Sequence, residues 1–206
     1  MGCQAPAAAP ARWDVGLAWS WFDTELSLTD MGLATMGHHA VSASATRLFT
    51  RGWSLRGAAG ATLGGSLHSK EGDGRQVDLH PGWQAAVQGA KRWRPAEGGA
   101  PFVSTSLAIA ASRATTDTGA LFASDLRLGL AVGWLVAGVW SPYLAGQVFG
   151  GPVLLTEGST TLRATDIRHY RASVGSGFFL GEHASLFVDV APAGELGLAG
   201  GATWRF

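Results

Sequence analysis

Apolar and polar residues alternate along most of the chain, with a period of two. Between Trp13 and Trp21 every second residue is large and apolar, and the residues between them are small or polar. Similar runs begin near Leu126, Tyr170 and Leu196. A period of two is typical of β-strands, because successive side chains of a strand point to opposite faces. The sequence therefore predicts an all-β protein.

The two faces of these strands differ in an unusual way. One parity carries Leu, Val and Trp, whereas the other carries mainly Gly, Ala and Ser with an occasional Arg, Asp or Gln. A soluble barrel places its bulky apolar residues inside, although soluble sheets also alternate. Here the small parity suits a narrow interior and the bulky parity suits contact with lipid. We predict an antiparallel, closed transmembrane β-barrel, with a soluble lipocalin-like or sandwich fold as the alternative.

Turn signals divide the chain into about ten strands. The second strand is the weakest, because Arg47 falls on the lipid face, which a bulge or an interfacial arginine would explain. The last two strands are short, so eight strands is the alternative count. Residues 1–11 are expected to be a disordered segment or a signal-peptide remnant, and residues 12–206 the barrel. The expected strands are 12–24, 37–50, 52–68, 77–93, 101–115, 121–136, 142–154, 163–180, 185–191 and 196–206.

The expected connections alternate in length. Those after the even-numbered strands are mostly short, whereas those at 23–36, 69–76, 116–120 and 156–162 are mostly longer and more polar. Short turns at one end and longer loops at the other are typical of bacterial outer-membrane barrels. An even strand number then places both termini on the short-turn, periplasmic side.

Aromatic residues gather near the expected strand ends. Trp83 and Trp93 lie ten residues apart on one strand, which at about 3.3 Å per residue and a tilt near 40° is roughly 25 Å of height. Amphipathic rings prefer the headgroup level of a bilayer. The expected membrane-interface aromatics are Trp13, Trp21, Trp53, Trp83, Trp93, Trp140, Tyr143, Tyr170, Trp204 and Phe206.

Composition narrows the function classes. The 206 residues include 15 Lys and Arg against 15 Asp and Glu, so no excess positive charge favours nucleic acid. A single cysteine rules out an internal disulfide framework. Every apolar stretch is interrupted before 18 residues, which argues against a membrane-spanning helix.

The C-terminal segment Gly201–Phe206 is an alternating strand that ends in a phenylalanine. It resembles the C-terminal insertion signature of bacterial outer-membrane β-barrel proteins. The resemblance implies recognition by the barrel-assembly machinery, and surroundings of outer-membrane lipid and lipopolysaccharide. The start, Met1–Pro6, has neither the basic region nor the apolar core of a signal peptide, which favours a signal already removed. Cys3 is then either a lipidated remnant or incidental.

Charged and amide side chains on the inward parity are expected to form a polar network in the lumen. A barrel of this size has an interior that side chains can fill, and a buried charge must be paired. The network is therefore predicted to be structural, and a small-solute or ion path is the alternative. Its expected members are Arg56, Gln84, Gln88, Arg92, Asp125, Arg127, Gln147, Arg171 and Asp189.

Two sets of residues resemble hydrolase sites in outline. Asp78 and His80, facing Asp166 and His169, are similar to the Asp–His arrangement of omptins, the outer-membrane proteases. Those enzymes also need a second acidic pair and taller walls, for which this chain is short.

The second set, His183, Ser185 and Glu195, is similar to the His-x-Ser and Glu residues of lipid A deacylases. A histidine activates a serine when a carboxylate orients it. The strand map places His183 and Glu195 at opposite ends of a strand. The sequence therefore predicts no catalytic residues, and an outer-membrane hydrolase of the lipid A deacylase or omptin type is the alternative.

Neither a metal site nor a cofactor is expected. The neighbours His38 and His39 point in opposite directions on an extended strand. The loops at the long-loop end carry more Asp and Glu than Lys and Arg, which would attract divalent cations or a basic partner. We expect a structural or binding barrel of the cell envelope, such as an anchor, adhesin or assembly partner, that does not bind nucleic acid.

Overall fold

The computed structural model describes residues 12–29, 32–70, 76–93 and 101–206. The expectations for residues 1–11, including Cys3, lie outside this range. The strands are β1 (Arg12–Leu28), β2 (Gly32–Leu48), β3 (Trp53–Ser69), β4 (Gln76–Trp93), β5 (Phe102–Thr115), β6 (Gly119–Gly133), β7 (Trp140–Gly150), β8 (Pro152–Glu157), β9 (Thr160–Asp166), β10 (Tyr170–Leu180), β11 (Ala184–Gly194) and β12 (Leu196–Arg205).

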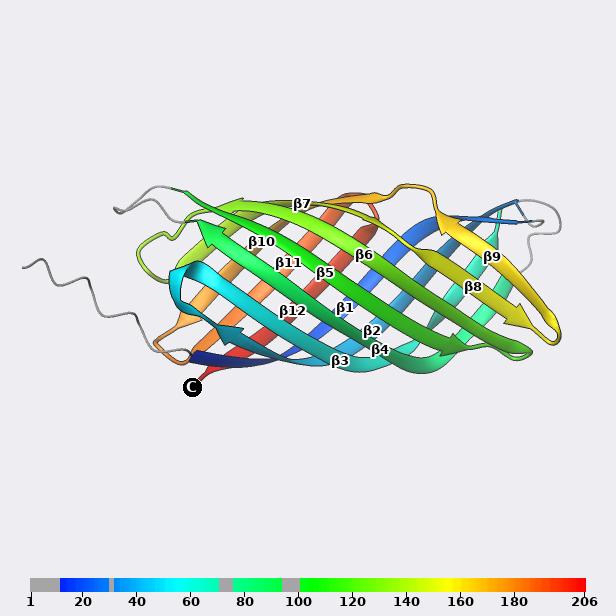
Figure 1. The fold of residues 1–206 in the computed structure, drawn as a ribbon, viewed down its shortest axis with the longest axis horizontal. Coiled ribbons are helices and arrows are strands. Elements are labelled where there is room, and N and C mark those ends of the chain that lie inside the picture. Colours follow the sequence, from blue (N-terminus) through cyan, green and yellow to red (C-terminus); the bar gives the residue numbers. More distant parts are fainter. Residues whose placement is uncertain (1–11, 30–31, 71–75, 94–100) are drawn as a thin grey trace, which may run out of the picture.

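These segments form one closed antiparallel barrel (Figure 1). Most strands pair with their sequence neighbours, and β12 pairs with β1 to close the wall. Because β7 and β8 are consecutive segments of one wall strand, and β9 and β10 of another, the wall has ten strands. This confirms the predicted all-β fold and the count of ten over the alternative of eight. Among the described residues, no helix is long and apolar enough to cross a membrane.

The two ends of the barrel differ in the number of strands that enclose them. We call the end that carries Arg12 and Arg205 the terminal end, and the opposite end the loop end. The hairpin of β11 and β12 turns at Glu195, part of the way along the wall. Beyond this turn β9 pairs directly with β1, with Leu26 opposite Asp166, and β8 pairs with β6. The ring at the loop end therefore consists of β1 to β6, β8 and β9 alone.

The predicted connection at residues 23–36 is wrong over most of its length. β1 continues to Leu28 and β2 begins at Gly32, so the two strands form a long hairpin. The predicted loop at 156–162 is likewise a tight turn between β8 and β9. The polar residues of these segments suggested loops, but their alternate side chains face inward and are buried. β1 and β2, with 17 residues each, are longer than the roughly ten residues that a bilayer crossing requires, so they continue past its boundary.

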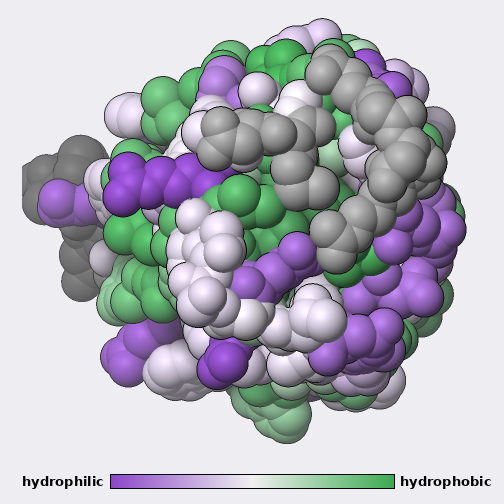
Figure 2. All heavy atoms as spheres, turned by 90° about the vertical axis from the view of Figure 1, so that its right-hand side faces the viewer, coloured by the Kyte–Doolittle hydropathy of each residue, from purple (hydrophilic) through white to green (hydrophobic). Residues whose placement is uncertain are grey.

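An apolar core fills the inside of the loop-end ring. Leu155 and Leu26 are its most buried leucines, with 0% and 1% of their surfaces exposed. Seen from this end, apolar side chains, drawn in green, lie between polar ones at the centre of the barrel (Figure 2). An eight-stranded ring is narrow enough for side chains to fill it. The core consists of Leu26, Leu28, Ala34, Met36, Leu67, Leu79, Ala114, Leu121, Val153, Leu155 and Ala164.

Between this ring and the terminal end, the bulky apolar side chains point outward instead of inward, as predicted. The outward residues are exposed and apolar, among them Leu17 with 70% and Ile109 with 64% of the surface exposed. Arg47 is also outward, and its guanidinium carbon lies 5.4 Å from the Trp13 ring and 5.5 Å from the Phe49 ring. Of the two explanations for Arg47, the interfacial arginine agrees with the structure, because the bulge between β2 and β3 lies at His39 and Ala40 instead.

The core of the loop end yields a stability prediction. Replacing Leu155 with Ala should reduce the free energy of unfolding by about 2–5 kcal/mol, because a cavity remains in a closed ring. Leu128→Ala, on the outward face of β6, should cost less, because lipid or detergent fills the space. Urea unfolding of the refolded barrel, followed by gel mobility, compares the two. Equal losses would contradict a packed interior at the loop end.

Candidate functional site

The middle of the lumen contains a network of ion pairs centred on Glu195. The Glu195 side chain is only 4% exposed. Arg127 donates to its two carboxylate oxygens, with Nη1 at 3.0 Å and Nη2 at 3.1 Å. Arg171 donates to the same carboxylate through Nη1 at 3.1 Å. Two guanidinium groups therefore hold one buried carboxylate.

Two aspartates complete the network. Asp125 accepts from Nε and Nη2 of Arg127 at 3.0 and 2.8 Å. Asp189 accepts from Nη2 of Arg171 at 3.0 Å and from the Ser173 hydroxyl at 3.0 Å. Asp125, Arg127, Arg171 and Asp189 were all expected on the inward parity, and the structure places them together. Each charged group of this network has a partner of opposite charge, as burial in a narrow lumen requires.

Glu195 is the member that sequence reasoning placed elsewhere. The strand map put it at the end of strand nine or ten that lies opposite His183, most of the membrane thickness away, whereas the turn between β11 and β12 lies part of the way along the wall. Just beyond the turn, the Glu195 amide donates to the Tyr170 carbonyl at 2.9 Å, and the Ile167 amide donates to the Glu25 carbonyl at 3.0 Å. The useful signal was the shortness of the last two strands. A short hairpin ends within the wall, so a charge at its turn must be buried and paired.

Tyr143 was predicted to be a membrane-interface aromatic, and the structure contradicts this. Its hydroxyl donates to Asp189 at 2.9 Å. Gly175 lies directly opposite Tyr143 on β10, and a methyl group there would lie 2.1 Å from the ring. The missing side chain of Gly175 leaves room for the ring to lie across the inner face of the wall. Tyr143 therefore belongs to the lumen network and not to an aromatic belt.

The other predicted network residues are not part of this cluster. Gln88, Arg92 and Gln147 line a cavity between the cluster and the terminal end. Arg56 lies opposite Gln88 in the register of β3 and β4, and Gln84 lies opposite Gly60 on β3. The predicted set therefore divides into a paired ion cluster and a more loosely packed polar wall.

This cavity, which we call the vestibule, has a volume of about 1740 Å³. Arg12, Asp14 and Arg205 line it, together with Ser104 and Ser106. Apolar residues border it as well: Leu48, Phe49, Trp53, Leu130, Leu135 and Phe179. Along the barrel axis the interior thus changes from the vestibule to the ion cluster and then to the apolar core of the loop end.

Neither hydrolase-like set is assembled. His80 Nε2 lies 2.7 Å from Asp117, and Asp78 accepts from Gln76 instead. Asp166 accepts from the Thr24 hydroxyl at 2.5 Å and from the backbone amide of Arg168 at 2.8 Å.

In the second set, the Ser185 hydroxyl lies 2.5 Å from that of Thr203, while Glu195 is held by the arginines of the ion cluster. His38 meets the Phe22 ring inside, and His39 stacks on Trp19. Within the described ranges, no three His, Cys, Asp or Glu residues are placed to hold a metal ion.

Part of the acidic charge at the loop end is paired. Glu25 accepts from Lys70 and from Nη2 of Arg168, the latter at 3.0 Å. The same arginine donates to the Gly194 carbonyl at 3.3 Å, above the hairpin turn. These bonds link β1 and the residue after β3 to the segment between β9 and β10. They therefore support the pairing of β9 with β1 on the loop-end side of the short β11–β12 hairpin.

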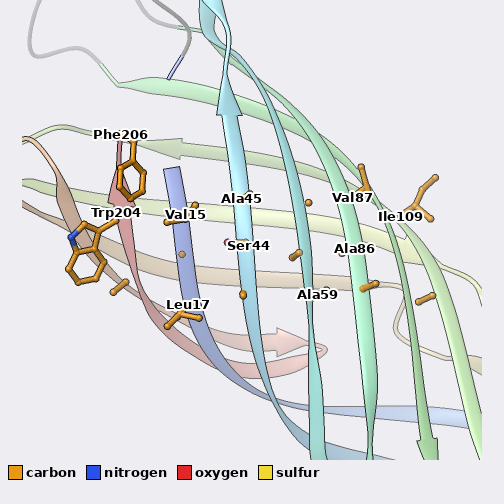
Figure 3. A pocket seen from close by; sticks show the side chains of 17 residues that line it. Val15, Leu17, Ser44, Ala45, Ala59, Ala86, Val87, Ile109, Trp204 and Phe206 are labelled. Atoms are coloured by element: carbon orange, nitrogen blue, oxygen red, sulfur yellow. The ribbon is translucent and has the colours of Figure 1, made fainter. Parts of the chain in front are cut away.

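The other predicted interface aromatics lie on the wall. Trp13, Trp53, Trp83, Trp93, Trp140, Tyr170, Trp204 and Phe206 are exposed apolar residues, and Trp21 is partly buried. A shallow groove of about 1100 Å³ crosses the outer wall from β12 to β5 (Figure 3). Its floor includes Ala45 and Ala59, while Trp204 and Ile109 stand at opposite sides. This face is almost entirely apolar, as contact with lipid requires.

No protein-family model and no curated protein matches the chain. Solved structures do match, over nearly the whole length. The outer membrane protein OprG of Pseudomonas aeruginosa has 9% identity and a TM-score of 0.52, and the match covers 95% of each chain. The outer membrane protease OmpT of Escherichia coli has 9% identity and a TM-score of 0.53, covering 95% of this chain and 96% of that one. The β-domain of the Bordetella autotransporter BrkA has 15% identity and a TM-score of 0.51, covering 96% and 99%.

The chain therefore has the fold of small bacterial outer-membrane β-barrel proteins. This confirms the class that the terminal phenylalanine and the strand pattern indicated. The three similar structures include a protease and an autotransporter domain, so the shared fold does not determine a function. The function must be argued from the lumen of this barrel.

The ion cluster yields a second prediction. Glu195→Ala should destabilise the barrel by about 3–5 kcal/mol, because it leaves two partly buried guanidinium groups short of negative charge. Glu182→Ala, in the exposed turn before β11, is the matched control and should change stability little. Urea unfolding of both variants measures the difference. Similar losses in the two would show that the cluster contributes nothing to the fold.

Proposed function

We propose that the protein is a non-conducting barrel of the bacterial outer membrane that serves as a binding component of the cell envelope. The observation that carries this proposal is the filling of the lumen. An apolar core occupies the loop end, and paired charges occupy the middle. Aqueous diffusion channels are formed by barrels of about sixteen strands, whereas this wall has ten.

In this proposal the protein is not an enzyme. The two hydrolase-like sets are separated, and their members bond to other residues. The vestibule is a polar concavity, and its mouth lies at the end where both strand termini meet. With the termini in the periplasm, the vestibule faces the periplasm and the loop end faces the cell exterior. Binding would then take place from the periplasmic side.

Conductance measurement tests the closed lumen. The purified full chain, inserted into a planar lipid bilayer, should give no ion-conducting steps, because apolar side chains exclude water from the loop end. A sixteen-stranded porin in the same bilayer is the positive control, and gel mobility before and after heating shows that the barrel is folded. Reproducible steps of defined size would contradict the proposal, especially if Arg127→Ala or Arg171→Ala changed their size.

Cysteine labelling tests the location and orientation. With the only cysteine, Cys3, replaced by Ser, single cysteines are introduced as Thr160→Cys at the loop end and Glu182→Cys at the terminal end. A membrane-impermeant maleimide should label Thr160→Cys on intact bacterial cells and Glu182→Cys only after the outer membrane is permeabilised. The reverse pattern would show the opposite orientation, and recovery of the chain outside the outer-membrane fraction would contradict the location.

A further inference from the structure

The groove on the outer wall is a gap in an otherwise bulky apolar face. On β6 the outward residues Leu126, Leu128 and Leu130 are each more than half exposed. On β2, β3 and β4 the outward residues at the groove are instead Ala43, Ala45, Gly57, Ala59 and Ala85. A methyl group at Gly57 would have no atom within 4 Å, so the space above this floor is open.

Towards the terminal end the groove leads to two cations. Arg47 is the next outward residue after Ala45 on β2, and Lys91 follows Val87 and Gly89 on the outward face of β4. A Cβ at Gly89 would also meet nothing within 4 Å, so no side chain closes the groove on β4 before Lys91. Only β3 separates the two strands, which places their backbones about 10 Å apart. The long side chains of Arg47 and Lys91 can therefore reach one anion between them.

Aromatic rings flank both cations. Lys91 Nζ lies 5.2 Å from the centre of the Trp53 ring and 5.2 Å from that of Trp93, and it donates to the Arg51 carbonyl. Arg47 lies between two rings, as described above. Among the described residues, neither cation forms an ion pair with a carboxylate. Cations beside tryptophan are typical of the headgroup level of a bilayer, where they attract anionic lipids.

We propose that this groove binds an anionic phospholipid, with the phosphate at Arg47 and Lys91 and an acyl chain along the alanine floor. The charge of the site selects this occupant, because an apolar groove that ends at two cations is complementary to an amphiphile with one anionic end. A zwitterionic lipid also carries a positive group, which these cations repel.

The shape of the groove favours a lipid chain over a second barrel. Trp204 and Phe206 stand on one side of the floor, and Val87 and Ile109 on the other (Figure 3). The convex wall of a second copy would contact these bulky residues first and leave the alanines uncovered. A single flexible chain fits between them and makes close contact with the floor.

The inference goes beyond the proposed function and rests on it only for the leaflet. With the termini in the periplasm, Arg47 and Lys91 lie at the periplasmic leaflet of the outer membrane, which consists of phospholipids. The site itself is on the outside of the wall and does not depend on whether the lumen conducts.

Native mass spectrometry of the full chain in an uncharged detergent tests the headgroup contacts. The probes are phosphatidylglycerol and phosphatidylcholine with the same two acyl chains. Phosphatidylglycerol should bind at least about tenfold more tightly at low salt, and added salt should reduce the difference. The double variant Arg47→Gln/Lys91→Gln should lose this preference. Arg113→Gln, outward on β5 towards the loop end, is the matched control and should keep it.

A groove-filling variant tests the position of the acyl chain. Ala59→Trp should weaken phosphatidylglycerol binding several-fold, because the indole occupies the space of the chain. Ala172→Trp, at an exposed alanine on β10, is the matched control and should bind like the unaltered chain. Both substitutions face lipid or detergent, and gel mobility before and after heating shows that every variant is folded.

Three results would overturn the proposal. Equal binding of the two lipids, or a preference that survives in the double variant, would show that Arg47 and Lys91 do not hold the phosphate. Unchanged binding in Ala59→Trp would show that the chain lies elsewhere. Lipid-free dimers that Ala59→Trp dissociates would show that a second copy covers the groove instead.

The conductance measurement remains separate from this one. A barrel that conducts ions but prefers phosphatidylglycerol through Arg47 and Lys91 would overturn the proposed function alone. A barrel that does not conduct and has no lipid preference would overturn the lipid site alone.

Discussion

The structure depends on one constraint, that the backbone groups of each strand in a closed wall must be hydrogen-bonded to a neighbouring strand. The hairpin of β11 and β12 ends at Glu195, so beyond it β1 and β10 would each lose a partner. In the structure, β9 pairs directly with β1 instead. The pairing of β9 with β1 reduces the ring at the loop end from ten strands to eight. The smaller diameter determines what can occupy its interior.

The order of the interior follows from that narrowing. In the smaller ring inward side chains meet across the axis, and apolar ones such as Leu26 and Leu155 pack to exclude water. The turn of the short hairpin brings Glu195 into the lumen where the ten-stranded wall meets the eight-stranded ring. There Arg127 and Arg171 neutralise its charge. Below the turn the ten-stranded wall is wider, and the vestibule remains.

This arrangement separates the roles of the charged residues. The carboxylates of the ion cluster and their arginines are mutually satisfied, so they contribute to the fold. Arginines also line the vestibule, where they lie beside glutamines and serines. The same residue type therefore belongs to a set of ion pairs in the middle of the barrel and lines an open cavity towards the terminal end.

The sequence by itself determined the class of fold, the sidedness of the wall and most strand positions, because alternation is a local property of the chain. It also placed Asp125, Arg127, Arg171 and Asp189 on the inward face for the same reason. Only the tertiary structure decided that β1 and β2 continue past the bilayer, that Tyr143 lies across Gly175, and that Glu195 joins the cluster. These depend on which strands meet beyond a short hairpin, and pairing between segments distant in sequence leaves no periodic signal in either one.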